Sequence, residues 1–256
     1  MKTHAITGPA GTLHVDDGGR GGGLPVLFVH SFAGSAAHWQ AQLAHLREHR
    51  RALAMDMRGH GASAAPENGD YAIPRLAEDI AAVVDALDVE RFVLVGHSMG
   101  GSAAVAYAGA HPSRLAGLVL MGTPGKAPPE MADAVMAALH ANYDETMAKY
   151  WDSLTEKAKP SVRALLQADM RQMGRSASLT MIGATFAFDP LPALADYPGP
   201  TLLIDTPHGD GAAALHRQMP QLERVLIDET SHWPQLDDPD AVERVLDAFL
   251  ARLEGS

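Results

Sequence analysis

A serine stands between two glycines in the stretch Gly96-His97-Ser98-Met99-Gly100, directly after an apolar run and directly before a helical pattern. A G-x-S-x-G spacing between a strand and a helix is typical of a nucleophile elbow, a sharp turn that holds a hydroxyl in the open beside a helix N-terminus. The serine backbone is strained at such a turn, and only small residues two positions either side of it avoid a collision. We therefore predict that Ser98 is a nucleophile.

A serine hydroxyl is a poor nucleophile at neutral pH and needs a base that accepts its proton. Among the 13 histidines, His232 is the best placed, because it follows the last strand-like run of the chain. A loop there returns to the carboxyl edge of the sheet, where open α/β sheets bind ligands. We predict that His232 is the general base and that His97, inside the elbow, is a packing residue. His45 and His49 are four residues apart on a helix but lack a nearby carboxylate pattern, so we interpret them as a solvated face and not as metal ligands.

Short apolar runs alternate with helical patterns from residue 24 to residue 122, which is typical of parallel strands joined by crossover helices. The runs are apolar at successive positions, so they suit central strands that are covered on both faces. Two short segments before residue 24 flank Gly8-Pro9-Ala10-Gly11 as a hairpin. The predicted central strands are 25–29, 52–55, 92–95 and 118–121, and the predicted helices are 35–47, 74–87 and 99–110.

The pattern changes after residue 122. Residues 123–197 contain no convincing strand, many Met and Ala residues, and helical stretches that break at prolines, so we predict a helical lid there. Strand-like runs return at 201–204 and 224–227, and an amphipathic helix at 239–253 closes the chain. The sequence therefore predicts an α/β fold with a mostly parallel central sheet flanked by helices. Residues 1–122 and 198–256 would form its core, with 123–197 as a lid inserted into it.

The composition limits the classes of partner. The 256 residues carry a formal net charge of -11, which disfavours nucleic acid and anionic membranes because both require clustered Lys and Arg. The chain has no cysteine, so it has no disulfide, no thiolate metal site and no cysteine nucleophile. No signal peptide and no membrane span is expected from the hydropathy pattern, and a cytoplasmic location is the default expectation.

Four motifs together resemble the α/β-hydrolase family, and the resemblance covers nearly the whole chain. They are His30-Ser31-Phe32-Ala33-Gly34 after the first central strand, Asp56-Met57-Arg58-Gly59-His60-Gly61-Ala62-Ser63 after the next, the elbow around Ser98, and His232. Serine esterases and cofactor-free haloperoxidases belong to this family. The resemblance implies an α/β-hydrolase fold with a Ser-His-Asp triad. It also implies that the stretch 56–63 is a structural turn, so Ser63 is not expected to be catalytic.

The family builds its oxyanion hole from two backbone N–H groups, one after the nucleophile and one in the loop after the first central strand. These positions correspond here to Met99 and Phe32. Two donors aimed at a developing oxyanion contribute a few kcal/mol each to the stability of the transition state. The family usually has His-Gly where this chain has His30-Ser31, so the Ser31 hydroxyl is expected to face the substrate pocket.

The resemblance places the triad acid beyond strand 201–204, where family members usually carry an Asp in a Gly-x-x-Asp setting. This chain reads Asp205-Thr206-Pro207-His208-Gly209-Asp210 at that place. Asp210 fits with one extra loop residue and is the favoured acid, whereas Asp205 at the strand end is its rival. A surface or capping role is the alternative for both. The other position that the family sometimes uses, after 118–121, offers only Gly122-Thr123-Pro124.

The expected reaction is cleavage of a small, mostly apolar carboxylic ester through an acyl-enzyme, with no metal and no organic cofactor. Methionines and aromatic residues of the lid suit an adaptable apolar pocket. Lactone, thioester, amide or carbon–carbon bond cleavage, peracid formation and hydroxynitrile lyase chemistry stay open, because a fold does not decide a function. A catalytically silent ligand-binding protein is the alternative from another class. The predicted substrate-binding residues are Ser31, Tyr143, Trp151, Phe186 and Trp233.

Overall fold

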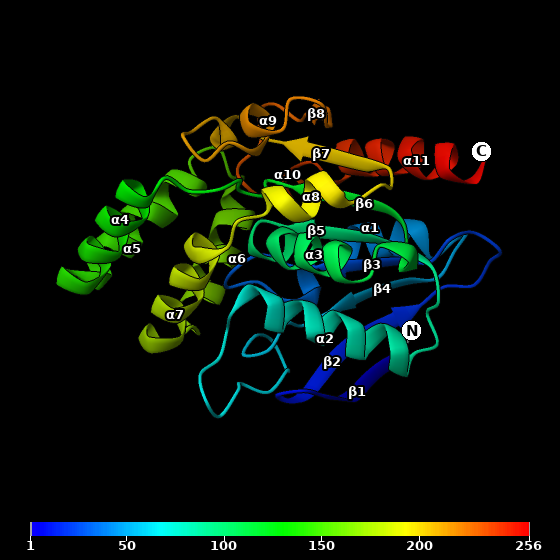
Figure 1. Cartoon of the computed structure of the whole chain (residues 1–256), viewed down its shortest axis with the longest axis horizontal. Coiled ribbons are helices and arrows are strands. Elements are labelled where there is room, and N and C mark those ends of the chain that lie inside the picture. Colours follow the sequence, from blue (N-terminus) through cyan, green and yellow to red (C-terminus); the bar gives the residue numbers. More distant parts are fainter. Residues whose placement is uncertain (1, 256) are drawn as a thin grey trace.

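The computed structural model describes residues 2–255, which contain an eight-stranded sheet in the order β1-β2-β4-β3-β5-β6-β7-β8 (Figure 1). β1 and β2 form the predicted hairpin, and β2 pairs antiparallel with β4. All pairs from β4 to β8 are parallel, so the prediction of a mostly parallel sheet is confirmed. The strands are β1 Lys2–Gly8, β2 Gly11–Gly18, β3 Val26–Val29, β4 Ala52–Met55, β5 Phe92–His97, β6 Leu115–Met121, β7 Thr201–Asp205 and β8 Glu223–Leu226.

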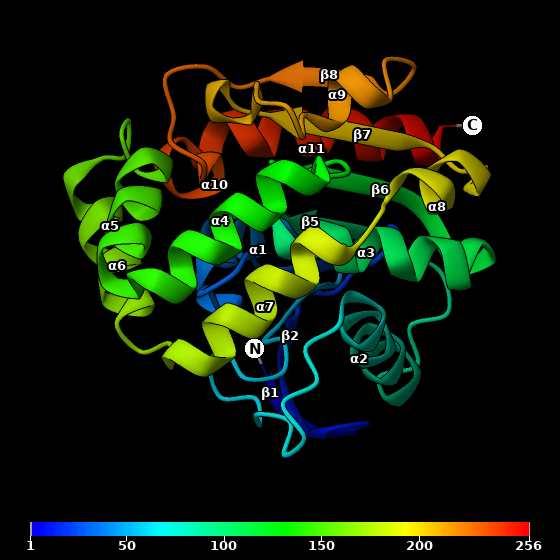
Figure 2. The ribbon, with the colours of Figure 1, turned by 60° about the vertical axis from the view of Figure 1, so that its left-hand side comes forward.

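Strands β3 and β4 are apolar at every position, which suits strands whose two faces are both covered by helices. In β3, Val26 and Phe28 pack on one side, whereas Leu27 and Val29 pack on the other, as the alternation of side chains along a strand requires. Two layers of helices result, one on each face (Figure 2). One face carries α1 Gln40–Leu46 and α11 Pro239–Glu254, and the other carries α2 Ile73–Ala86, α3 Met99–Ala110 and α8 Leu191–Asp196.

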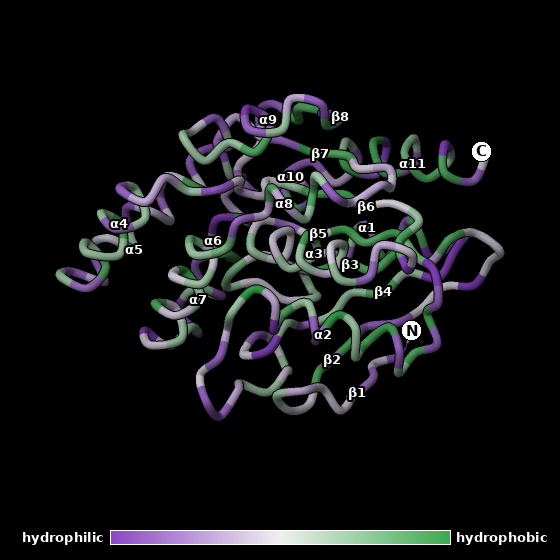
Figure 3. The backbone as a smooth tube through the Cα atoms, viewed as in Figure 1, coloured by the Kyte–Doolittle hydropathy of each residue, from purple (hydrophilic) through white to green (hydrophobic). Residues whose placement is uncertain are grey.

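The helices differ in how they meet water. The α11 helix alternates between hydrophilic and hydrophobic residues along its length, and it buries Val242, Leu246, Phe249 and Leu250 against the sheet (Figure 3). The α3 helix is instead buried over most of its surface and consists largely of Gly, Ala and Ser. Small side chains let α3 lie close behind the sheet, so its N-terminus is fixed at the carboxyl end of β5.

Strand β6 begins three residues earlier than the sequence predicts, at Leu115. The extra residues include Gly117, which weakens a strand pattern in sequence. In the structure, a Cβ at Gly117 would lie 2.8 Å from atoms of both Phe249 and Leu253. The glycine is therefore required by the close packing of α11, and this contact is invisible in the local pattern.

Five helices lie between β6 and β7 along the chain. In residues 2–255, no strand of the sheet lies in this segment. Four of them, α4 to α7, lie beyond the end of the sheet toward which the arrow of β7 points (Figure 1). The division of the chain into a core and a lid domain remains a prediction. In residues 2–255, no helix combines the length and the apolar character needed to cross a bilayer. The helices not yet given are α4 Pro129–Ala141, α5 Tyr143–Leu154, α6 Pro160–Met170, α7 Arg175–Ala187, α9 Leu215–Gln218 and α10 Pro234–Asp237.

Candidate active site

Ser98 occupies a strained turn between β5 and α3. Its backbone has φ 53° and ψ −118°, a combination that a residue with a side chain adopts only when its surroundings enforce it. The Ser98 N–H donates to the Met121 carbonyl at 2.8 Å. A Cβ at Gly96 would lie 2.5 Å from the Gly100 carbonyl oxygen, and a Cβ at Gly100 would lie 2.2 Å from the His30 carbonyl oxygen. Both glycines are thus sterically required, as the sequence predicts.

The two predicted oxyanion donors lie at the ends of neighbouring strands. Met99 is the first residue of α3, where a backbone N–H has no partner within the helix. Phe32 follows β3, which pairs directly with β5. Within residues 2–255, neither N–H donates a hydrogen bond. Two free donors therefore flank the Ser98 turn, which is the arrangement that an oxyanion requires.

Two buried neutral histidines hold the loop that contains Phe32. His30 donates from Nδ1 to the Ser31 carbonyl at 2.7 Å and accepts the Met57 N–H on Nε2 at 3.0 Å. Nε2 of His60 accepts the Ala33 N–H at 3.2 Å. Ala33 has a φ of 56°, so this hydrogen bond holds an unusual backbone conformation. Burial lowers the pKa of His60 to about 4 and the pKa of His30 well below its usual value. Both rings therefore stay neutral and can accept these backbone N–H groups at physiological pH.

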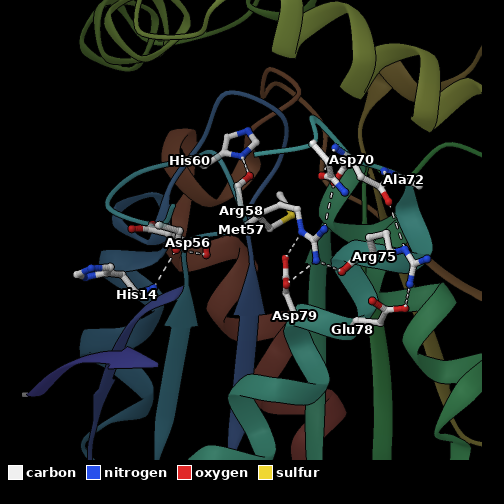
Figure 4. Close-up of polar contacts among 12 residues, drawn as sticks. His14, Asp56, Met57, Arg58, His60, Asp70, Ala72, Arg75, Glu78 and Asp79 are labelled. Carbon is white, nitrogen blue, oxygen red and sulfur yellow. Dashed lines mark hydrogen bonds and ion pairs between the residues drawn. The ribbon is translucent and has the colours of Figure 1, made fainter. Parts of the chain in front are cut away.

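The turn 56–63 is a structural support, as predicted. The Asp56 carboxylate accepts the Ala36 N–H at 2.7 Å and the Ala62 N–H at 2.9 Å, while Ser63 donates to the Asp56 carbonyl. Arg58 and Asp79 form a bidentate pair at 2.6 and 2.7 Å inside the protein (Figure 4). These contacts fix the turn that presents His60 to the loop that contains Phe32.

His232 lies in the loop after β8 and is anchored by its backbone. Its carbonyl accepts the Nε2–H of His97 at 2.8 Å, and its N–H donates to the Leu154 carbonyl at the end of α5 at 3.1 Å. His97 in turn accepts a hydrogen bond from the Gln235 side chain at 3.1 Å. His97 therefore ties the elbow to the His232 loop, which is more than the packing role predicted from sequence.

The His232 ring sits against the end of β6, next to the residue that binds the Ser98 backbone. A Cβ at Gly122 would lie 2.9 Å from Cε1 and 3.2 Å from Nδ1 of this ring. Burial, with a smaller contribution from His208, lowers the pKa of His232 to about 3. The ring is therefore neutral at physiological pH and able to accept a proton. The Ser98 hydroxyl makes no hydrogen bond within residues 2–255, and such contacts are often long before substrate binds.

The structure does not bring the predicted acid, Asp210, to His232. Asp210 is mostly exposed and pairs with Arg217 at 2.6 Å; this hydrogen bond holds the pKa of its carboxyl below the usual value. The rival, Asp205, lies 2.8 Å from His216 and 3.0 Å from Arg224. Nδ1 of His232 is buried and has no hydrogen-bond partner in residues 2–255. Cationic partners in the fold thus hold both carboxylates away from the base.

Three of the predicted substrate-binding residues pack together at the loop that contains Phe32. The Trp233 indole donates to the Ser31 hydroxyl at 3.0 Å, and both residues are buried. Ser31 therefore links the loop that contains Phe32 to the His232 loop, and its role in substrate binding stays a prediction. The Trp151 ring lies 6.4 Å from Phe32 and 5.2 Å from Trp233, measured between ring centroids. Trp151 thus brings α5 directly over the site.

The other two predicted substrate-binding residues, Tyr143 and Phe186, lie on two different helices. Tyr143 is buried at the start of α5, with the Arg175 guanidinium 5.2 Å from its ring centroid, and Phe186 on α7 is partly exposed. His45 is not expected to be a metal ligand, and its Nε2 atom lies 2.8 Å from a carboxylate oxygen of Asp247. In residues 2–255, no three His, Asp or Glu side chains converge as a metal site.

A scan of family models matches residues 25–177 to the alpha/beta hydrolase fold family. Among curated proteins, the acetyltransferase component of the acetoin cleaving system of Pseudomonas putida is 27% identical and covers 90% of this chain. The 2-hydroxymuconate semialdehyde hydrolase of Pseudomonas putida is 26% identical, and the alignment covers 92% of this chain and 90% of the relative. Among solved structures, a thermophilic esterase from Thermogutta terrifontis has a TM-score of 0.81 and 25% identity, with 99% of both chains covered.

The chain spans only part of several curated relatives. It covers 64% of the acetyltransferase component, and 41% and 39% of the next two relatives.

Proposed function

This chain belongs to the α/β-hydrolase fold family, and from that premise we propose that it is a serine hydrolase that cleaves small carboxylic esters. The observation that carries the proposal is the strained Ser98 turn, which has φ 53° and lies between the free N–H groups of Phe32 and Met99. Backbone strain of this kind persists where the surrounding structure and the function require it. A packing role for Ser98 would need neither the strain nor the free donors.

The proposed reaction has two halves. His232 accepts the Ser98 proton on Nε2 while Oγ attacks the ester carbonyl carbon, and the oxyanion accepts hydrogen bonds from the Phe32 and Met99 N–H groups. Collapse of this intermediate breaks the bond to the alkoxide, which leaves with the proton from His232. Water then adds to the acyl group by the same route, and the acid is released. Loss of one oxyanion donor typically costs about 2.7–4 kcal/mol in transition-state stability.

The preference for an apolar acyl or aryl group rests on the residues above the site. Trp151, Trp233 and Phe32 form a contiguous aromatic cluster, and buried Met147 and Met181 lie in the helices around it. Such walls favour apolar groups, and flexible methionines tolerate variation in their shape. The likeness to the Thermogutta terrifontis esterase supports an ester as the substrate.

The test compares turnover of p-nitrophenyl acetate and butyrate by the wild type and Ser98→Ala, with folding checked by circular dichroism. We expect Ser98→Ala to lose about 10³-fold or more in kcat, as removal of a nucleophile does in related mechanisms. A fluorophosphonate probe should label the wild type and leave the folded Ser98→Ala variant unlabelled. A Ser98→Ala variant that keeps the wild-type rate would refute the serine mechanism.

A second function, that of a catalytically silent ligand-binding protein, is favoured by one observation. Among residues 2–255, Nδ1 of His232 has no carboxylate partner, so no carboxylate of these residues stabilises an imidazolium there. A silent protein would bind apolar esters without turning them over and would resist the fluorophosphonate. The labelling experiment therefore separates the two functions. Carbon–carbon bond cleavage, suggested by the name of the 2-hydroxymuconate semialdehyde hydrolase, would instead show as turnover of that semialdehyde lost in Ser98→Ala.

A further inference from the structure

The His232 ring lacks the partner that a histidine base normally has. In a serine triad, the group at Nδ1 fixes the tautomer, so that the proton stays on Nδ1 and the lone pair on Nε2 faces the serine. Here Nδ1 is buried and has no hydrogen-bond partner among residues 2–255. A buried polar atom without a partner costs about 1–3 kcal/mol, so a group that can approach it has a clear energetic reason to do so.

His208 has a ring nitrogen that can accept a hydrogen bond, and its ring packs against the His232 ring. It lies in the short turn Pro207–Gly209 that follows β7, the position from which the resemblance predicts the acid. The rings of His208 and His232 are 5.7 Å apart between centroids and meet edge to face at 68°. Rings at this separation can bring two nitrogens to within about 3.5 Å after a side-chain rotation, close to hydrogen-bond distance.

The two carboxylates of the same loop are engaged elsewhere. Asp205 contacts His216 and Arg224, and Asp210 contacts Arg217 and His216. Moving either carboxylate to His232 would break at least two ion pairs, and one of the two, Asp205, is buried. His208 takes part in no ion pair with the other described residues and can move at lower cost.

We propose that His208 is the positioning residue of His232 and replaces the carboxylate of a serine triad. This inference rests on the proposed function. Neutral His208 accepts the Nδ1–H of His232 on a ring nitrogen, which holds Nε2 toward Ser98. When His232 takes the Ser98 proton, it becomes an imidazolium that His208 stabilises as a neutral acceptor. No proton passes to His208, so the step requires no further reactant.

The arrangement makes turnover depend on the protonation of His208. A protonated His208 has no lone pair to offer and repels the imidazolium, so kcat should fall as pH falls through its pKa. Partial desolvation lowers this pKa, and the charge of Glu156 raises it in part. His232 faces two titratable rings, His208 and His97, and His97 is buried with a pKa well below its usual value.

The test compares the kcat, KM and pH profile of wild type, His208→Ala, His208→Asp and the control His49→Ala, whose side chain is 74% exposed. We expect His208→Ala to lower kcat about 10- to 100-fold with KM changed less than about threefold, and His49→Ala to match the wild type. His208→Asp should keep or raise kcat. Its acidic limb should then follow the protonation of His232 instead of His208, because His208 is gone and a carboxylate beside His232 raises the pKa of that ring.

A separate measurement works even if no ester is turned over. We expect an exchange-protected, downfield ring N–H signal of His232 in the proton NMR spectrum of the wild type, present in His49→Ala and absent in His208→Ala. If His208→Ala keeps this signal and the wild-type kcat, the proposal is overturned, while an inactive Ser98→Ala leaves the serine mechanism intact. If Asp210→Asn loses the signal and His208→Ala does not, Asp210 is the partner and the proposal is equally overturned.

Discussion

Lowering the pH from about 7.5 to about 5.5 should destabilise the fold strongly, because four buried histidines are held neutral. His30, His60, His97 and His232 are 0%, 3%, 0% and 7% exposed. Burial lowers the pKa of each, to about 4 for His60 and about 3 for His232. The unfolded chain binds protons at these positions below about pH 6.5, whereas the native state does not, so stability must fall as the pH falls.

The size of the effect follows from the number of rings. A histidine that stays neutral in the fold loses about 1.3 kcal/mol of stability between pH 7.5 and 5.5, when its unfolded pKa is about 6.5. Four such rings give about 5 kcal/mol, a large share of the roughly 5–15 kcal/mol that stabilises a typical protein. For a chain of this length, the melting temperature should drop by about 10–20 °C. Below about pH 4, His60 becomes protonated in the fold, and its share stops growing.

Thermal unfolding followed by far-UV circular dichroism measures this shift directly. His60→Asn keeps an acceptor for the Ala33 N–H and should reduce the pH-dependent drop by about a quarter, since one of four rings is gone. His49→Asn, at an exposed position, should leave the drop unchanged. A melting temperature that stays constant between these two pH values would refute the conclusion that the four rings are neutral in the fold.

Two further predictions concern buried polar contacts. Arg58→Met should lower the free energy of unfolding by about 3–5 kcal/mol in urea titrations, because the buried Asp79 carboxylate loses its partner, and Arg58→Met combined with Asp79→Leu should recover most of this loss. Ser31→Ala should cost about 1–3 kcal/mol and lower kcat for p-nitrophenyl butyrate, since the buried Trp233 N–H loses its acceptor, whereas unchanged unfolding and turnover would contradict the proposed tether.

The fold was predictable because its signals are local. A central strand shows itself as an unbroken apolar run, since both faces are buried, and the run 52–55 coincides with β4. The elbow combines a strand, two glycines and a helix within a few residues, and the predicted helix 99–110 matches α3. The strain at Ser98 and the close approach of Gly96 to the Gly100 carbonyl follow from this local geometry.

Polar partners were harder to predict because they come from distant parts of the chain. Ser31 stands where the family pattern usually has glycine. The sequence shows that this position carries a hydroxyl, but it does not show which group the hydroxyl contacts. Its hydrogen-bond partner, Trp233, lies 202 residues away. His97 likewise finds its acceptor 135 residues away, at the His232 carbonyl. Both contacts join the elbow side of the site to the His232 loop, and only the folded chain reveals them.

The segment after β7, where the family carries the acid, differs from the family pattern at both of its defining positions. In a Gly-x-x-Asp pattern counted from the end of β7, Asp205 takes the place of the glycine and His208 takes the place of the Asp. The fourth position of this pattern, counted from Asp205, is therefore His208. Asp210, the predicted acid, lies two residues beyond it. The structure explains why the carboxylates stay where they are: Arg224 pairs with Asp205, Arg217 pairs with Asp210, and His216 lies 2.8 Å from Asp205. In the proposed arrangement, an uncharged ring beside His232 avoids the cost of burying a carboxylate. Without a charged partner, His232 would be a weaker base than a carboxylate would make it.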